Sequence, residues 1–333
     1  MNSRPPVFTL LAWFVCVLGQ SLSPVHGCIW DSDTLASERA RFPGIDLLIT
    51  GSFATHSREF HEWRIAQRQK DIASATAMPE HYDDLAVSQH KLGQHKAAIA
   101  TMQEKDKLVP GLYETYSNLG TFYIYTGELQ KALTTIDQAL AINPNAHFGR
   151  EKYQKWLVQW ILEKQQEPNS PQELITGSTT IEPVGFARFV ARQISGGLPA
   201  YSRQKLSLSP DQRTAAIHGI RGMMWFADFN NPHLQEALGD LLIVGDSQTN
   251  ANRLASLCYL HASLKATDPR DQKRLTIKCN VSGLQSRGFD IEKSKADLQK
   301  ALNHGARYRE SVRQDEVKWI AEGLDAQAEF QKK

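Results

Sequence analysis

The sequence lacks an excess of charge of either sign. Its 333 residues include 38 Lys and Arg against 36 Asp and Glu, which gives a formal net charge of +2. No basic run occurs along the chain, whereas proteins that bind nucleic acid gather Lys and Arg against the phosphates. We therefore expect no nucleic-acid partner. The composition, 41% hydrophobic and 22% charged, is that of a globular chain long enough for one large or two ordinary domains.

The short motifs of common catalytic sites are also missing. The sequence contains no Gly-x-Ser-x-Gly turn, no phosphate-binding loop and no dinucleotide-binding glycine pattern. None of its 11 histidines has the spacing of a metal-ligand pair. No second histidine follows His61 four residues later, and His90 and His95 are five residues apart. We therefore expect no metal, no cofactor and no catalytic residue.

Two aspartates near the N-terminus, Asp31 and Asp33, could offer oxygen atoms to calcium. The further loop ligands and the glycine of an EF-hand are missing after them. We instead expect Asp33 to cap a helix that begins at Thr34, because Asp is favoured at that position.

Long hydrophobic runs are scarce. One apolar run, residues 7–19, has 13 residues and is too short to span a bilayer. It follows the basic residue Arg4 and precedes small residues at Val25 and Gly27, a pattern typical of a secretory signal. We therefore predict that residues 1–27 are a signal peptide, that the protein is periplasmic or extracellular, and that the mature chain has no transmembrane helix.

Cysteine is rare, with four residues in the chain. Removal of the signal would take away Cys16 and leave Cys28, Cys258 and Cys279, an odd number for an oxidising compartment. Cys28 would then be the first mature residue, where bacterial lipoproteins carry their lipid, although the match to that signal is partial. If Cys28 is lipidated, Cys258 and Cys279 remain as a natural disulfide pair. If it is not, Cys28 could bond to either one and leave a thiol over.

What the sequence does have is an internal period of 34 residues. Seven positions of the stretch 82–110 recur in type at this offset in the stretch 116–144. The pairs are Tyr82 and Tyr116, Leu85 and Leu119, Ala86 and Gly120, Gly93 and Gly127, Ala98 and Ala132, Met102 and Ile136, and Pro110 and Pro144. In length and residue types the period resembles the tetratricopeptide repeat (TPR), a pair of antiparallel helices.

The residue types in the second copy suit a tight helical hairpin. Tyr116, Leu119 and Tyr123 lie on one face of a first helix, since they are spaced at i, i+3 and i+7. Gly120 on that face would let the second helix approach closely, and Gly127 would permit the turn between the two helices.

The sequence therefore predicts an all-α fold in which a TPR-type helical hairpin array is followed by further antiparallel helical hairpins. After the signal we predict N-terminal helices over residues 28–78 that pack on the array, the array over 79–164, a linker over 165–182 and a C-terminal helical, partly TPR-like region over 183–333. Within the array, the repeats cover about 79–112 and 113–146, and a capping helix covers 147–164. Residues 271–288 are predicted as a loop, with 275–281 as the best candidate for a strand.

The first helices of a TPR array line its concave groove, which suits a protein or peptide partner. The groove-facing positions that this predicts are Asp83, Val87, His90, Glu114, Ser117, Thr121, Ile124 and Lys155. Their mixed charges do not match the Asn and Lys pattern by which some TPR domains bind a C-terminal carboxylate. The alternative is a solvated concave face without a ligand.

Two further stretches, residues 28–35 (Cys-Ile-Trp-Asp-Ser-Asp-Thr-Leu) and 147–153 (His-Phe-Gly-Arg-Glu-Lys-Tyr), resemble a group of exported bacterial TPR proteins of unknown function. The resemblance covers most of the mature chain. It implies an exported, non-enzymatic helical protein, and it carries over no catalytic residues.

Three functional hypotheses follow. The first is an exported protein that binds a protein or peptide partner in the cell envelope through the repeat groove. The second is a hydrolase with its site in the C-terminal region, for which Glu236, Asp240 and His233 are the first residues to inspect. The third is an envelope-assembly factor anchored to the membrane through lipid on Cys28.

Overall fold

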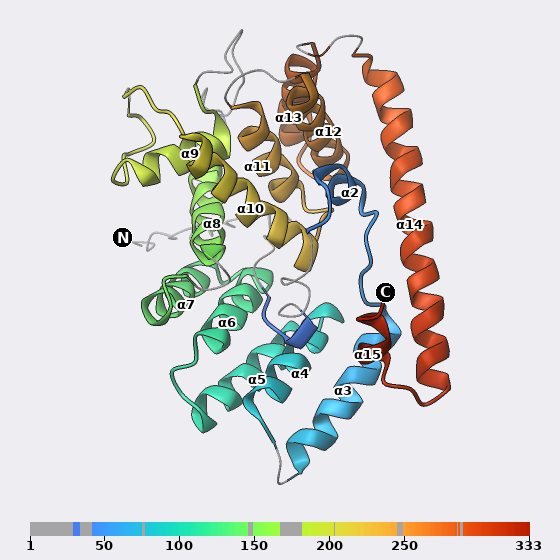
Figure 1. The fold of residues 1–333 in the computed structure, drawn as a ribbon. Helices are drawn as coiled ribbons and strands as arrows, with labels where there is room; N and C mark the ends of the chain where they lie inside the picture. The colour runs from blue at the N-terminus through green and yellow to red at the C-terminus, as the bar shows by residue number, and fades with distance from the viewer. Residues whose placement is uncertain are drawn as a thin grey trace, which may run out of the picture.

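The structure is a computed structural model that describes residues 29–33, 42–74, 77–145, 149–166, 182–202, 204–244, 249–284, 286 and 289–333. The predicted signal peptide and Cys28 lie outside the described residues, as does most of the predicted linker. All regular structure in the described ranges is helical, which confirms the predicted fold class for this part of the chain (Figure 1).

Four consecutive helices form two hairpins at the predicted positions. They are α4 (Pro79–Lys91), α5 (His95–Leu108), α6 (Tyr113–Tyr125) and α7 (Leu129–Ile142). Gly93 and Gly127 hold the two turns with the same positive φ of 79°, a conformation that glycine adopts without a steric penalty. The 34-residue period of the sequence is therefore also a period of the backbone.

The helices of the second hairpin pack at close range through Gly120. A methyl group added to this glycine would lie 2.6 Å from the side chain of Ile136 on α7. In the first hairpin Ala86 and Met102 take the same two places, and both are fully buried. Ala98 and Ala132 complete a core of small and large side chains, as the sequence pattern predicts.

The N-terminal helices divide between the two ends of the molecule. α3 (Arg58–Ala73) packs against α4 and covers the open side of the first hairpin, in agreement with the prediction. α2 (Ile45–Thr50) lies instead against α10, α12 and α14 of the C-terminal region. Of these two helices, α3 packs on the array and α2 packs on the C-terminal helices.

The C-terminal region is a further set of antiparallel helices. It follows α8 (Glu151–Gln166), which lies at the position of the predicted capping helix and contacts α7, α9 and α10. The region comprises α9 (Gly185–Ile194), α10 (Pro210–Phe226), α11 (Pro232–Ile243), α12 (Thr249–Lys265), α13 (Pro269–Leu284), α14 (Ile291–Ala321) and α15 (Ala326–Phe330). Ser209 and Gln212 form the predicted capping box of α10, and the Asn231 side chain accepts the first amides of α11.

Helix α13 corrects the predicted loop at 271–288 and the candidate strand within it. Leu275, Cys279 and Ser282 are buried at helical spacing and form the inner face of this helix. Lys278 is also fully buried on that face, where it pairs with carboxylates of α11. A charged residue, Lys278, occupies a core position and hides the helical pattern in the sequence.

Helix α14 joins the two ends of the molecule. Its 31 residues, about 46 Å of helix, run from the C-terminal helices past α2 to α3. Figure 1 shows α14 along one side of the molecule, with α15 beside α3 and the start of the array. In the described ranges no helix combines the length and apolar character that crossing a membrane requires.

Candidate functional site: a chain segment in the repeat groove

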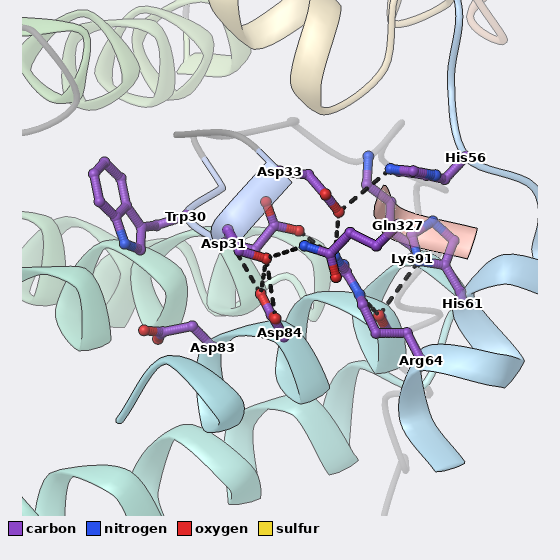
Figure 2. Close-up of polar contacts among 12 residues, drawn as sticks. Trp30, Asp31, Asp33, His56, His61, Arg64, Asp83, Asp84, Lys91 and Gln327 are labelled. Carbon is purple, nitrogen blue, oxygen red and sulfur yellow. Dashed lines mark hydrogen bonds and ion pairs between the residues drawn. The ribbon is translucent and has the colours of Figure 1, made fainter. Parts of the chain in front are cut away.

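Residues 29–33, which we call the N-terminal segment, lie across the first helices of the array. Ile29 is 2% exposed and Asp31 is nearly as well buried. Figure 2 shows Trp30, Asp31 and Asp33 above the array helices, with the two aspartates close to Arg64. The groove that the sequence predicted as a partner site is therefore covered by the protein's own chain.

Asn118 on α6 pairs with the backbone of Trp30. The Trp30 amide donates to Asn118 Oδ1 at 2.9 Å, and Asn118 Nδ2 donates to the Trp30 carbonyl at 3.0 Å. The indole ring also meets the ring of Tyr113 edge to face, with centroids 5.7 Å apart. Asn118 thus satisfies both polar groups of one peptide residue, a contact that depends on the backbone rather than on the side chain.

Asp84 on α4 holds the segment two residues further along. Its carboxylate accepts the Ser32 amide at 3.0 Å and the Ser32 hydroxyl at 2.9 Å. Arg68 donates to the other oxygen of Asp84, and Gln327 of α15 donates to the Ser32 hydroxyl at 2.7 Å. The N-terminal segment therefore lies between the array on one side and the C-terminal helix on the other.

Arg64 on α3 neutralises both aspartates of the segment. Its side chain, 0% exposed, donates to Asp31 at 2.8 Å, to Asp33, and to the Ser88 hydroxyl at 2.6 Å. Burial alone would raise the pKa of Asp33, but Arg64 and His56 outweigh that effect and lower the pKa to about 2. Ser32 and Asp33 are already helical, so the prediction that Asp33 caps a helix beginning at Thr34 is wrong. Its carboxylate pairs with Arg64 and His56 instead.

His56 connects the same aspartate to the long C-terminal helix. Its Nε2 lies 3.3 Å from Asp33, and its Nδ1 lies 2.6 Å from Glu316 on α14. The imidazole stacks on Phe60 with ring centroids 3.6 Å apart. Burial would lower the pKa of His56, but the two carboxylates outweigh it and raise the pKa.

Most of the predicted groove residues do not lie on an exposed surface. Six of them are buried: Asp83, Val87, His90, Ser117, Thr121 and Ile124. Asp83 pairs with Lys105 at 2.6 Å, Thr121 accepts from Gln154, and His90 stacks on Phe122. These side chains serve contacts between neighbouring helices and are not open to a ligand in this state.

The other two predicted groove residues, Glu114 and Lys155, are partly exposed. Lys155 pairs with Asp137 on α7 at 2.5 Å. Both therefore lie where a partner could reach them while the N-terminal segment is in place.

The residues that bind the segment are not among the predicted groove positions, although the 34-residue period could have indicated two of them. Asp84 and Asn118 are 34 residues apart, so they occupy the same position in successive repeats, and each accepts a backbone amide of the segment. No such pattern could indicate Arg64, because it lies on α3, which precedes the repeats, and because its partners in the segment are distant in the sequence.

The residues named for a hydrolase form a buried ion-pair network. Glu236 pairs with Lys164 at 3.0 Å, with Lys278 at 2.7 Å and with Arg274. Asp240 accepts from Lys278 at 2.8 Å, and also from the Tyr259 hydroxyl and the Phe186 amide. Both carboxylates are inaccessible to solvent, and they join five helices: α8, α9, α11, α12 and α13.

The surroundings of Glu236 do not suit a general acid. Burial would raise its pKa, but three nearby cations outweigh that effect and hold the pKa well below the ordinary value. His233 lies at the start of α11, where its amide donates to Asn231. The ion pairs of the network tie α8, α11 and α13 together.

Cys258 and Cys279 are both buried free thiols, so the predicted disulfide between them is not formed in the structure. Burial raises the pKa of both thiols, that of Cys279 to about 12. Neither would be an active nucleophile at neutral pH, because thiolate is the reactive form.

The comparisons with known proteins bear on the second hairpin. Residues 113–146 match the family model of the tetratricopeptide repeat. The matched range is the second predicted repeat, so the array of hairpins is of the TPR type, and TPR units support a role in protein–protein interaction. The comparison with curated proteins gave no match.

Proposed function

We propose that this chain is an exported interaction protein that binds a peptide segment of a protein partner in its TPR groove. The observation that carries the proposal is the double hydrogen bond between Asn118 and the backbone of Trp30. A side-chain amide that satisfies both the N–H and the C=O of one residue holds that residue through its backbone, whatever its side chain.

The repeat period supports the same function. Trp30 and Ser32, whose amides are accepted by Asn118 and Asp84, are alternate residues of the segment, which becomes helical at Ser32. Equivalent positions of successive repeats therefore accept two amides of one chain segment. This arrangement favours peptide binding over a solvated face without a ligand.

Export is supported by the composition of residues 1–27, and a non-catalytic role by the ion pairing of Glu236 and Asp240. Intact-mass analysis of the purified chain tests export. We expect a mature chain that begins at Cys28 in the envelope fraction. An added lipid mass would identify the membrane-anchored assembly factor, and unprocessed protein in the cytosol would contradict export.

Site-specific photocrosslinking in the producing cell tests the partner. A photoreactive residue at Lys155, a predicted groove position that is partly exposed, is expected to capture a defined protein. The exposed position Ala100 on α5, in the other hairpin, provides a control in the same array. Equal crosslinks from both positions, or crosslinks from Ala100 alone, would contradict binding at the groove.

A further inference from the structure

We propose that the N-terminal segment occupies the site at which the partner binds. That partner presents an aromatic residue, an acidic residue directly after it, and a second acidic residue two positions further along its chain. This inference rests on the proposed function and adds to it the chemistry of the partner and the competitor that it must displace. It follows from the charged and polar side chains of the groove that lose their partners when the segment leaves.

The first requirement is negative charge. Arg64 is fully buried, and both carboxylates to which it donates belong to the segment. Removal of one member of a buried ion pair leaves an uncompensated charge, which is strongly unfavourable. An incoming chain must therefore supply carboxylates at the places of Asp31 and Asp33, two residues apart.

The second requirement is a set of backbone donors and a small hydroxyl. Asn118 and Asp84 accept two alternate amides, so neither position of the incoming chain can be proline, which has no N–H. Asp84 and Gln327 both contact the Ser32 hydroxyl, which favours serine or threonine between the two acidic residues. The edge of Tyr113 favours an aromatic residue before them.

Exchange of the segment for a partner also affects the C-terminal helices. The segment is contacted by Gln327 of α15, and through His56 it is joined to Glu316 of α14. Exchange of the segment for a partner peptide must break and remake these contacts. Amide hydrogen exchange in α15 therefore reports on the exchange.

The test uses a fluorescent peptide with the sequence Ile-Trp-Asp-Ser-Asp, blocked at both ends, and anisotropy to measure its binding. The receptor is the mature full chain in two forms, the wild type and the double variant Asp31→Asn/Asp33→Asn, whose own segment is weakened. We expect the double variant to bind the peptide at least about tenfold more tightly, because its own segment competes less. Asp46→Asn, at an exposed position of α2, serves as the matched control and should bind as the wild type does.

Two further arms establish specificity. A peptide with asparagine in place of both aspartates should bind at least about tenfold more weakly, and Arg64→Lys in the double variant should weaken the aspartate peptide, since lysine lacks the two-pronged donor geometry. No binding to a folded double variant, or equal binding of the asparagine peptide, would overturn the proposal. If the double variant does not fold, the wild type must still bind the aspartate peptide more tightly than the asparagine peptide, and equal binding of the two would overturn the proposal.

A concentration-dependent dimer of the wild type that is lost in the double variant would assign the groove to a second copy of this chain and overturn the proposal. Failure of the peptide together with a specific crosslink from Lys155 would overturn only this inference. Failure of both experiments would overturn the proposed function as well.

Discussion

The imidazole of His56 lies 2.6 Å from the carboxylate of Glu316, a residue 260 positions further along the chain. On its other side the same ring lies 3.3 Å from Asp33 of the N-terminal segment. A single, mostly buried side chain thus joins the N-terminal segment to α14. Protonation of this ring should affect how firmly the two are joined.

We predict a pH-dependent contribution of His56 to stability. Its folded pKa is raised above the ordinary value of 6.5, so its contribution is fully present below about pH 6.5 and is lost as the pH rises through the folded pKa. His56→Gln should lower the free energy of unfolding by about 1–3 kcal/mol at pH 5.5 and by less at pH 8.5. Denaturant unfolding of both proteins at the two pH values measures the difference.

Other groups near His56 also titrate, so the relevant quantity is the difference in the free energy of unfolding between the variant and the wild type. His61 has its pKa lowered by burial and by Arg64, so its effect has the opposite sign. The exposed His304 provides the control, since His304→Gln should show little change at either pH. A difference for His56→Gln that grows as the pH rises would contradict the ion-pair role.

Gly120 offers a test of the repeat packing. A methyl group at this position would meet Ile136, so Gly120→Ala should destabilise the protein by about 1–3 kcal/mol through overpacking. The first repeat accommodates Ala86 beside Met102. Gly120→Ala/Ile136→Met copies that pair, and thermal or denaturant unfolding should show that it recovers most of the loss. If the two substitutions changed the free energy of unfolding additively, with no recovery in the double variant, the two repeats would not pack in the same way.

Glu236 tests the structural role of the ion-pair network. Glu236→Gln removes the negative charge shared by Lys164, Lys278 and Arg274, and it should cost about 3–5 kcal/mol at pH 7. The folded pKa is lowered, so this contribution is present above the ordinary value of 4.5 and is lost as the pH falls through the folded pKa. Denaturant unfolding at pH 7 and pH 3 measures the loss, with the exposed Glu310→Gln expected to have little effect.

A stability cost at pH 3 as large as that at pH 7 would contradict the electrostatic explanation for Glu236. Loss of a hydrolytic activity in a variant that keeps its full stability would return the residue to the hydrolase hypothesis.

Much of the fold could be predicted because its determinants are local. Gly93 and Gly127 mark two turns, and the pairs around Ala98 and Ala132 repeat the same packing. The capping box at Ser209 likewise fixes the start of α10 within a few residues of sequence. Helix α13 was missed because Lys278 is buried by carboxylates that are 38 and 42 residues away, which no local pattern reveals.

The site was harder to predict for the same reason. Positions such as Asp83 and Ser117 do lie on the first helices of the repeats, but both are buried. The residues that hold the segment obtain their role from partners such as Asp31, 33 positions from Arg64, and Trp30, 88 positions from Asn118. Composition and period indicate that a groove exists, and only the fold shows that the chain itself fills it.

The most direct test of the central claim is the hydrogen exchange of the Trp30 amide, measured by NMR on the mature chain. If Asn118 holds this residue in the groove, the amide should exchange as slowly as the buried amides of α6, and Asn118→Ala should bring it close to the rate of an unstructured peptide. Gln138→Ala, in the same array, should leave the rate unchanged. Exchange of the wild-type Trp30 amide at the rate of an unstructured peptide would contradict the account.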